Sequence, residues 1–444
     1  MRPSVTYSSN WRFPLPEIHL LDSGIRVLAF HLPGQHVVAA ELVLDCGVHA
    51  EPGNLEGIAT ITARSCDEGT LAHPGTGIAE ALESHGALVH AHQSHYTAQL
   101  RLEVPSTRLL TSLELFAEIV RTPQLTDFDV AHQIDMAIAD HAARLASPRG
   151  AAGLAFRRAM YAPEDRRTRP EAGTPATLAA ITGEAVRSFH RDHWGPAGAV
   201  LILAGDLPAG AVDSIASVFD GWSTQRQLAD SPARFAARPR VLVVDRPQSV
   251  QADVIIGCPA VGRQEPRLAP AILAGQAMAG AFSSRLNLAL REERGYCYGI
   301  NGGFAPGRHG GVFTASGSFR IEVASEAIGI ARDILGLSEA FTAAEIEAAR
   351  IHHLGISPLV NSTASDIADQ AARLADGRVE VGYLHQLDER IRAVTPDAAT
   401  SVFRELVRPD KLHIALTGPA DVLCPQLAGL GLDPEVVDLG SAPS

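Results

Sequence analysis

Cysteine is scarce in this chain, and long apolar runs are missing. The five cysteines are scattered without a Cys-x-x-Cys pair, which argues against a disulfide framework or a thiolate metal site and fits a reducing compartment. No apolar run approaches the length needed to cross a bilayer, so we expect no membrane span. The first residues also lack the apolar segment and cleavage site of a secretory signal. We therefore expect a cytoplasmic protein.

Positive charge is also in deficit. The chain has 37 Lys and Arg against 50 Asp and Glu, a net charge of -13. Proteins that bind nucleic acids attract phosphate with basic patches, so this balance argues against a nucleic-acid partner, whereas basic peptides would suit it. The 444 residues, 46% of them hydrophobic, suit a globular protein of two or more domains.

An internal repeat organises the chain. Phe189–Pro196, followed by the apolar segment 199–205, is echoed by Phe403–Pro409, followed by 413–418. Both copies predict a helix, a proline, a strand and a glycine in that order. The two copies predict two homologous domains, each of about two hundred residues.

Upstream segments extend the repeat. Residues 99–105 correspond in order to 318–323 as strands, and a helical stretch follows each of them, at 109–120 and at 327–335. Thr126 and Thr342 then stand where each could cap the next helix. The stretch 221–238 is polar and has no sustained apolar period, so we predict a linker there. The first domain is then 1–220 and the second is 239–444.

The pattern of strands indicates the fold class. Several predicted strands follow one another directly, which favours an α+β fold over a doubly wound sheet. The strands expected from apolar and β-branched runs are 24–30, 37–44, 240–244 and 253–256.

The segment Gly57-Ile-Ala-Thr-Ile-Thr-Ala-Arg-Ser-Cys-Asp-Glu-Gly-Thr70 is the most informative in the chain. With its flanks it resembles the insulinase and mitochondrial processing peptidase family, whose inverted zincin motif His-x-x-Glu-His lies between a Gly-x-Ala and a Gly-Thr. The resemblance covers essentially the whole chain. It implies two homologous α+β rolls, each a mainly antiparallel sheet flanked by helices.

The resemblance places the three motif positions on Thr60, Ala63 and Arg64. In the intact motif two imidazoles bind Zn²⁺ and the Glu is the general base on the metal-bound water. Thr and Ala can do neither, and a guanidinium repels a divalent cation. The family's third ligand falls on Asp140, where the residues alone suggest a solvated carboxylate. We therefore expect a degenerate zinc motif and no metal in this chain.

A second segment, Phe282-Ser-Ser-Arg-Leu-Asn-Leu-Ala-Leu-Arg-Glu-Glu-Arg-Gly-Tyr-Cys-Tyr298, predicts a capped helix, a left-handed Gly295, and then a strand with Tyr296 and Tyr298 on one face. It is similar to the family's Ser-Ser-Arg-Leu…Leu-Arg-Glu-x-Arg-Gly-x-x-Tyr motif, whose Arg and Tyr fall on Arg291 and Tyr298. The resemblance implies that they contact the bound peptide. An Arg fork suits a peptide carbonyl, and a Tyr hydroxyl can donate to a developing oxyanion. A surface Arg and a half-buried sheet Tyr are the alternative.

The strand that contains His90 and His92 falls where the family has the edge strand that takes up substrate beside the zinc. The two imidazoles share a strand face, but no third metal ligand accompanies them. An edge strand can still pair with an extended peptide through its backbone. In a half that lacks the metal we expect a structural role for it.

Three functions remain open. The first is a non-zinc, substrate-binding subunit of a heterodimeric zinc endopeptidase, which lends Arg291 and Tyr298 to the enclosed chamber of a homologous partner with intact His-x-x-Glu-His. Zn²⁺ is then expected on the partner, and this chain alone has no activity. The second is a catalytically silent scaffold or interaction protein of the same fold. The third is a stand-alone metal enzyme that uses Asp140 and nearby histidines.

Overall fold

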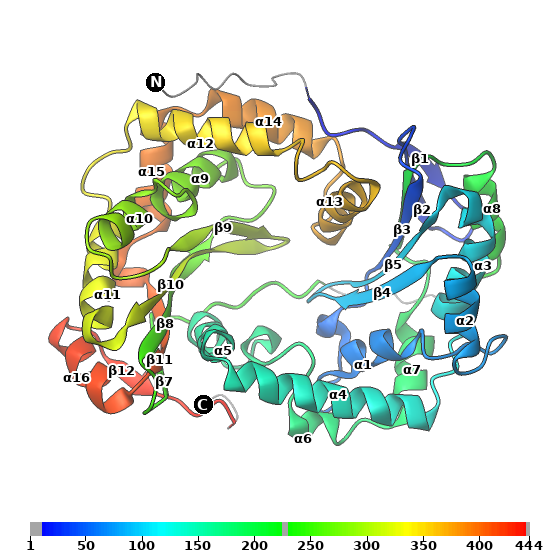
Figure 1. Ribbon diagram of the computed structural model, residues 1–444, viewed down its shortest axis with the longest axis horizontal. Coiled ribbons are helices and arrows are strands. Elements are labelled where there is room, and N and C mark those ends of the chain that lie inside the picture. The colour runs from blue at the N-terminus through cyan, green and yellow to red at the C-terminus, as the bar shows by residue number, and fades with distance from the viewer. Residues whose placement is uncertain (1–10, 224–229, 441–444) are drawn as a thin grey trace.

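The computed structural model of the chain describes residues 11–223 and 230–440, and two β-sheets on opposite sides of the molecule form its framework (Figure 1). Within these ranges each sheet has six strands. The first sheet has the order β1 (Glu17–Leu20), β2 (Arg26–His31), β6 (Val200–Gly205), β3 (Val37–Leu44), β5 (Ala98–Pro105) and β4 (Leu88–Gln93). The second has the order β12 (Pro434–Val436), β7 (Val241–Asp245), β11 (His413–Gly418), β8 (Gln251–Ala260), β10 (Gly310–Arg320) and β9 (Asn301–Gly307).

Five strands of each sheet repeat one topology, and only the edge strands β1 and β12 differ. β2 and β6 pair in parallel, as β7 and β11 do. β3 pairs antiparallel with β6 and β5, and β8 does the same with β11 and β10. Most neighbouring strands are antiparallel, so the predicted α+β fold with two homologous, mainly antiparallel sheets is confirmed. The linker expected at 221–238 includes residues 224–229, which lie outside the described residues, and its bounds stay a prediction.

Helices flank both sheets. The helices of the first half are α1 (Ile58–Ser65), α2 (Gly77–Ser84), α3 (Leu109–Arg121), α4 (Asp127–Ala146), α5 (Pro148–Met160), α6 (Pro175–Leu178), α7 (Gly183–His193) and α8 (Ala211–Val218). Those of the second half are α9 (Leu268–Gly275), α10 (Arg285–Asn287), α11 (Ile321–Leu335), α12 (Ala343–Ile356), α13 (Ala364–Asp376), α14 (Tyr383–Ala393), α15 (Pro396–Leu406) and α16 (Ala420–Gly429). No helix in the described part of the chain is both long and apolar enough to cross a membrane.

The two halves exchange one helix each. α5 belongs to the first half but packs on β7, β8 and β11, while α13 belongs to the second half and packs on β3 and β6 (Figure 1). Small buried side chains line both contact faces: Ala151, Ala155 and Ala159 on α5, and Ala368, Ala371 and Ala372 on α13. Alanine lets a helix lie close to a sheet, and apolar burial then holds the two halves together.

Local signals placed several elements correctly. The strand predicted at 37–44 is β3, and α7–β6 and α15–β11 are the two copies of the repeat. Thr126 accepts from the Asp129 N–H at the start of α4, and Thr342 forms a capping box with Glu345 at the start of α12. One match was wrong: Ile321–Val323 begin α11 instead of ending a strand, because β10 passes into the helix without a loop.

Candidate functional site

Helix α1 carries three of the four positions that the resemblance assigns to zinc chemistry. It begins after Gly57, whose φ of +105° suits glycine and whose Cβ position would be 2.6 Å from the Ala172 carbonyl oxygen. The Glu51 carboxylate accepts the N–H groups of Gly57 and Ala59 at 3.0 and 3.1 Å, which satisfies donors at the helix start. Arg166 donates to the other Glu51 oxygen at 2.9 Å. The backbone of α1 is therefore firmly held.

The side chains at these positions bind one another and the backbone. Arg64 Nη1 donates to Asp140 Oδ2 at 2.8 Å, which joins α1 to α4. Thr60 Oγ1 donates to the Glu171 carbonyl oxygen at 3.3 Å, and Ala63 is buried. The structure thus brings Arg64 and Asp140 together, a contact that the sequence reasoning missed although opposite charges stood at two positions expected to converge.

This group of side chains does not fit Zn²⁺. A zinc site needs several N, S or O donors around one point, and here the only carboxylate is already bound to a guanidinium. Throughout residues 11–223 and 230–440, no three His, Cys, Asp or Glu side chains are grouped so that they could hold a metal ion. The geometry offers an ion pair where the resemblance would have a metal.

The edge strand β4 runs beside α1. It is the last strand of the first sheet, and His90 and His92 are exposed on one of its faces, as predicted. Burial raises the pKa of the neighbouring Asp67 to about 6, and His90 lowers it in part. Gln93 is buried and donates to the carbonyl oxygens of Cys46 and Thr97 at 3.3 and 3.0 Å. This end of β4 has a structural task.

Arg291 lies at a distorted helix end. The short helix α10 passes into a π-helical turn, Leu288–Glu292, and Gly295 then adopts the predicted left-handed conformation with φ +63°. The Arg291 guanidinium carbon lies 3.9 Å from the centre of the Phe282 ring, a cation–π contact. Its Nε is 3.4 Å from Glu292 Oε1, and the Arg291 side chain is 28% exposed.

A buried asparagine fixes both ends of this segment. Asn287 Nδ2 donates to the carbonyl oxygens of Ala281 and Ile300 at 3.0 and 2.9 Å, and its Oδ1 accepts the Ile300 N–H at 2.8 Å. Sequence reasoning missed it. The available signal was a polar residue between the apolar Leu286 and Leu290, since a buried amide in such a place must be hydrogen-bonded.

The strand predicted for Tyr296 and Tyr298 was wrong. β9 begins only at Asn301, because Asn287 takes up both backbone groups of Ile300 before the ladder starts. Cys297 forms an isolated antiparallel bridge with Phe319, and Tyr298 after it lies at a bend and is 97% exposed. Tyr296 donates to Glu326 Oε1 at 3.0 Å.

The two motifs of the chain lie far from each other. Figure 1 shows α1 and α10 on opposite sides of the molecule, each beside the sheet of its own half. In the described part of the chain no hydrogen bond or ion pair joins Arg291 or Tyr298 to Thr60, Ala63, Arg64 or Asp140. Arg291 and Tyr298 therefore do not serve the α1 of the same chain in this structure.

The fold and this pair of segments define a peptidase-like protein of two homologous α+β domains. The family described as insulinase (peptidase family M16) matches residues 26–160, and the one described as the peptidase M16 inactive domain matches residues 180–351. The chain belongs to the insulinase, or M16, peptidase family.

Relatives and solved structures agree with this assignment. An uncharacterized zinc protease of Streptomyces coelicolor is 24% identical over 90% of this chain and 88% of its own length. An uncharacterized zinc protease of Mycobacterium tuberculosis is 23% identical over 91% of this chain and 93% of its own length. A peptidase M16 inactive domain from Pseudomonas fluorescens has a TM-score of 0.83 at 22% identity, covering 91% of this chain and 98% of its own. A Helicobacter pylori protease has a TM-score of 0.82 at 15% identity, with 91% and 100% covered.

Proposed function

We propose that this chain is the substrate-binding subunit of a two-chain zinc endopeptidase. A homologous partner with an intact His-x-x-Glu-His motif would hold Zn²⁺ and the general base. This chain would lend Arg291 and Tyr298 to the partner's site, inside a chamber that the two chains enclose. The substrates would be short or unfolded peptides, and the pair would work in the cytoplasm.

The exposed Tyr298, set on the frame that Asn287 holds, is the observation that carries the proposal. A tyrosine exposed to 97% gains nothing for folding from its ring or its hydroxyl. Its hydroxyl is free to donate to the oxyanion of a bound peptide, and the nearby Arg291 fork can bind a peptide carbonyl.

The state of α1 supports the same division of labour. The Arg64–Asp140 ion pair occupies the positions of two metal ligands, so this chain has no use for Arg291 and Tyr298 at a zinc site of its own. The separation of α1 from α10 in Figure 1 agrees with a site that is completed by a second chain. Both a zinc protease and a peptidase M16 inactive domain are among the proteins similar to this chain, which is compatible with a family that contains metal-binding and metal-free domains.

The test is to purify the chain alone, a homologous chain with intact His-x-x-Glu-His alone, and the two together. Bound zinc and cleavage of a fluorogenic peptide are measured in each preparation. We expect zinc only where the homologous chain is present and rapid cleavage only in the mixture. Stoichiometric zinc and cleavage by the lone chain would instead establish a stand-alone metal enzyme. A stable complex whose cleavage rate equals that of the homologous chain alone would establish a scaffold.

A further inference from the structure

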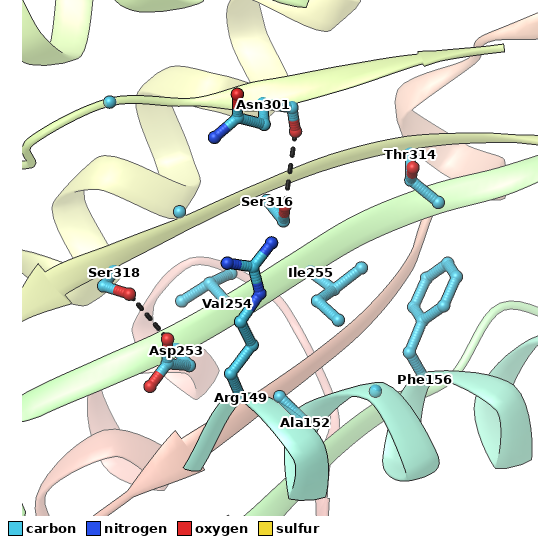
Figure 2. Close-up of a pocket in the computed structure, with 13 residues that line it drawn as sticks. Arg149, Ala152, Phe156, Asp253, Val254, Ile255, Asn301, Thr314, Ser316 and Ser318 are labelled. Carbon is cyan, nitrogen blue, oxygen red and sulfur yellow. Dashed lines mark hydrogen bonds between the residues drawn. The ribbon is translucent and has the colours of Figure 1, made fainter. Parts of the chain in front are cut away.

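A polar cavity lies between α5 and the second sheet. Its volume is about 350 Å³, in the lower part of the range of about 300–1,000 Å³ found for small-ligand sites. Figure 2 shows Arg149 extending from the first turn of α5 toward the strands. The polar side chains of the lining are Arg149, Asp253, Asn301, Thr314, Ser316 and Ser318.

The equivalent surface in the other half is filled. In the first sheet Glu41 pairs with Arg101 across β3 and β5, and α13 covers them. Arg101 Nη2 donates to Glu41 Oε2 at 2.7 Å and also contacts Asp369 of α13. The space beneath α13 is thus occupied by an ion network in which Glu41 is buried and Asp369 is partly exposed.

In the second sheet the registers place Ile255 and Ser316 where the first has Glu41 and Arg101. Ile255 pairs with Ser316 and with Ala415, the third residue of β11, just as Glu41 pairs with Arg101 and with the third residue of β6. A serine replaces a long cation there, and no ion pair between residues of 11–223 and 230–440 fills the space. The cavity is the consequence of this difference between the halves.

Arg149 is the one cation in the lining, and it makes no hydrogen bond or ion pair with any described residue. Ser365, the second residue of α13, donates to Glu103 at 2.6 Å. Arg149 is the second residue of α5, but the register places Ser318 where the first sheet has Glu103. The residue that α5 presents at this place thus faces a serine instead of a carboxylate, and Asp253, the carboxylate of the lining, is not within ion-pair distance of Arg149.

The charges of the lining select the ligand. Arg149 offers a bidentate fork, which matches a carboxylate. Asp253 accepts from Ser318 at 2.5 Å through Oδ1 and keeps its second oxygen for an N–H donor, such as a peptide amide. Phe156 and Ile255 add apolar surface for a side chain. A carboxylate, an amide N–H and a small apolar side chain together describe the last residue of a peptide.

We propose that this cavity binds the carboxyl-terminal residue of a peptide, with its terminal carboxylate on Arg149. Gly299, which follows Tyr298, also lines the cavity, so a peptide anchored here passes beside the Arg291 segment. The inference rests on the proposed role as a peptide-binding subunit and adds to it a preference for substrates with a free carboxyl end close to the bond that is cut.

The test measures binding to this chain alone, so it does not depend on a partner or on cleavage. The probe is a short peptide labelled at its amino end and ending in leucine, as the free acid or the amide, with fluorescence anisotropy as the readout. We expect the amide to bind at least about tenfold more weakly, because it loses a charge-assisted hydrogen-bonded pair. Arg149→Met should weaken the acid to the level of the amide and leave the amide unchanged.

Arg144→Met is the matched control, because it removes the same charge from the last turn of α4, outside the cavity. It should bind both peptides as the parent chain does, and thermal unfolding should show that both variants are folded. Equal binding of acid and amide by the parent, or equal weakening of both by Arg149→Met, would overturn the proposal. An amide peptide with an internal Glu that binds as tightly as the free acid would overturn the assignment to a terminal carboxylate. If binding follows Arg149 while the mixture of chains fails to cleave, only the proposed function fails.

Discussion

The two halves differ at the sheet surface that the exchanged helix covers: charged side chains fill it in the first half, and a cavity lies there in the second. Under α13, the buried Glu41, the largely buried Arg101 and the partly exposed Asp369 form an ion network, whereas the matching surface under α5 is a cavity whose Arg149 pairs with none of the described residues. At α1, Arg64 and Asp140 neutralise each other. A duplicated fold can therefore keep one copy for stability and the other for contact with a ligand.

In the second half the polar groups are arranged differently. The segment that carries Arg291 and Tyr298 is held by a buried amide, Asn287, while Tyr298 is 97% exposed and the half-buried Arg291 lies over the exposed Phe282 ring. Such an arrangement prepares side chains for a ligand before the ligand arrives, which reduces the entropy lost on binding. The variants below test this contrast between a first half whose charged side chains pair with one another and a second half whose cavity lacks such a pair.

The largest effect on stability is expected from Arg101→Met. Glu41 is only 3% exposed, and without Arg101 it would be a buried carboxylate lacking its closest cation. We expect a loss of about 3–5 kcal/mol in the free energy of unfolding, measured in urea. The equivalent Ser316→Ala should change it by less than about 0.5 kcal/mol. Similar losses for the two variants would remove the contrast between the halves.

One histidine in each half should make the free energy of unfolding depend on pH. Burial lowers the pKa of His190 and of His413 to about 4 from the usual 6.5. Between pH 6.5 and 4 the unfolded chain therefore binds protons that the folded chain does not, so stability is complete above this window and falls as the pH is lowered.

His190→Gln should remove up to about 3 kcal/mol of that loss, because one pKa unit corresponds to about 1.4 kcal/mol. A glutamine amide can replace the contact of His190 Nε2 with the Val120 carbonyl oxygen, 2.8 Å away. Urea unfolding at several pH values measures the slope, and His413→Gln should reduce it in the same direction. Variants and parent with identical slopes would contradict the assignment.

A loss of about 1–3 kcal/mol is expected for Asn287→Ala, since the Ile300 N–H and carbonyl would lose their buried partner. Asn301→Ala is the matched control, because the Asn301 side chain is exposed and should contribute less than about 0.5 kcal/mol. Unfolding in urea compares the two. Equal values would mean that Asn287 does not hold the segment.

The smallest effect is expected at the ion pair of α1. The side chains of Arg64 and Asp140 are 36% and 52% exposed, and pairs at such exposure contribute at most about 1 kcal/mol. Arg64→Met should therefore change the free energy of unfolding far less than Arg101→Met. A loss of several kcal/mol would show that this ion pair is a main support of the first half.

Local patterns predicted much of the fold. The apolar strand 37–44, the caps at Thr126 and Thr342 and the left-handed Gly295 follow from local sequence, and the structure has all of them. The exchange of α5 and α13 could not be predicted, because an alanine-lined helix face fits either sheet equally well. The bend at Tyr298 was not predicted, because it depends on hydrogen bonds between Asn287 and Ile300, which are 13 residues apart in the chain.

The candidate site was predicted only in part. Spacing and resemblance located Arg64, Asp140, Arg291 and Tyr298, but not the ion pair that joins the first two. The cavity under α5 could not be predicted from the sequence. It is explained only when the strand registers of the two sheets are compared, which places Ser316 where the first sheet has Arg101.

The most direct measurement of the central claim is the cleavage rate of the reconstituted pair when this chain carries Tyr298→Phe. Tyr296→Phe is the control two residues away, because its hydroxyl is bound to Glu326. The proposed divided site predicts a rate about ten- to a thousandfold lower for Tyr298→Phe, with unfolding unchanged, and no loss for Tyr296→Phe. An unchanged rate with Tyr298→Phe would contradict it.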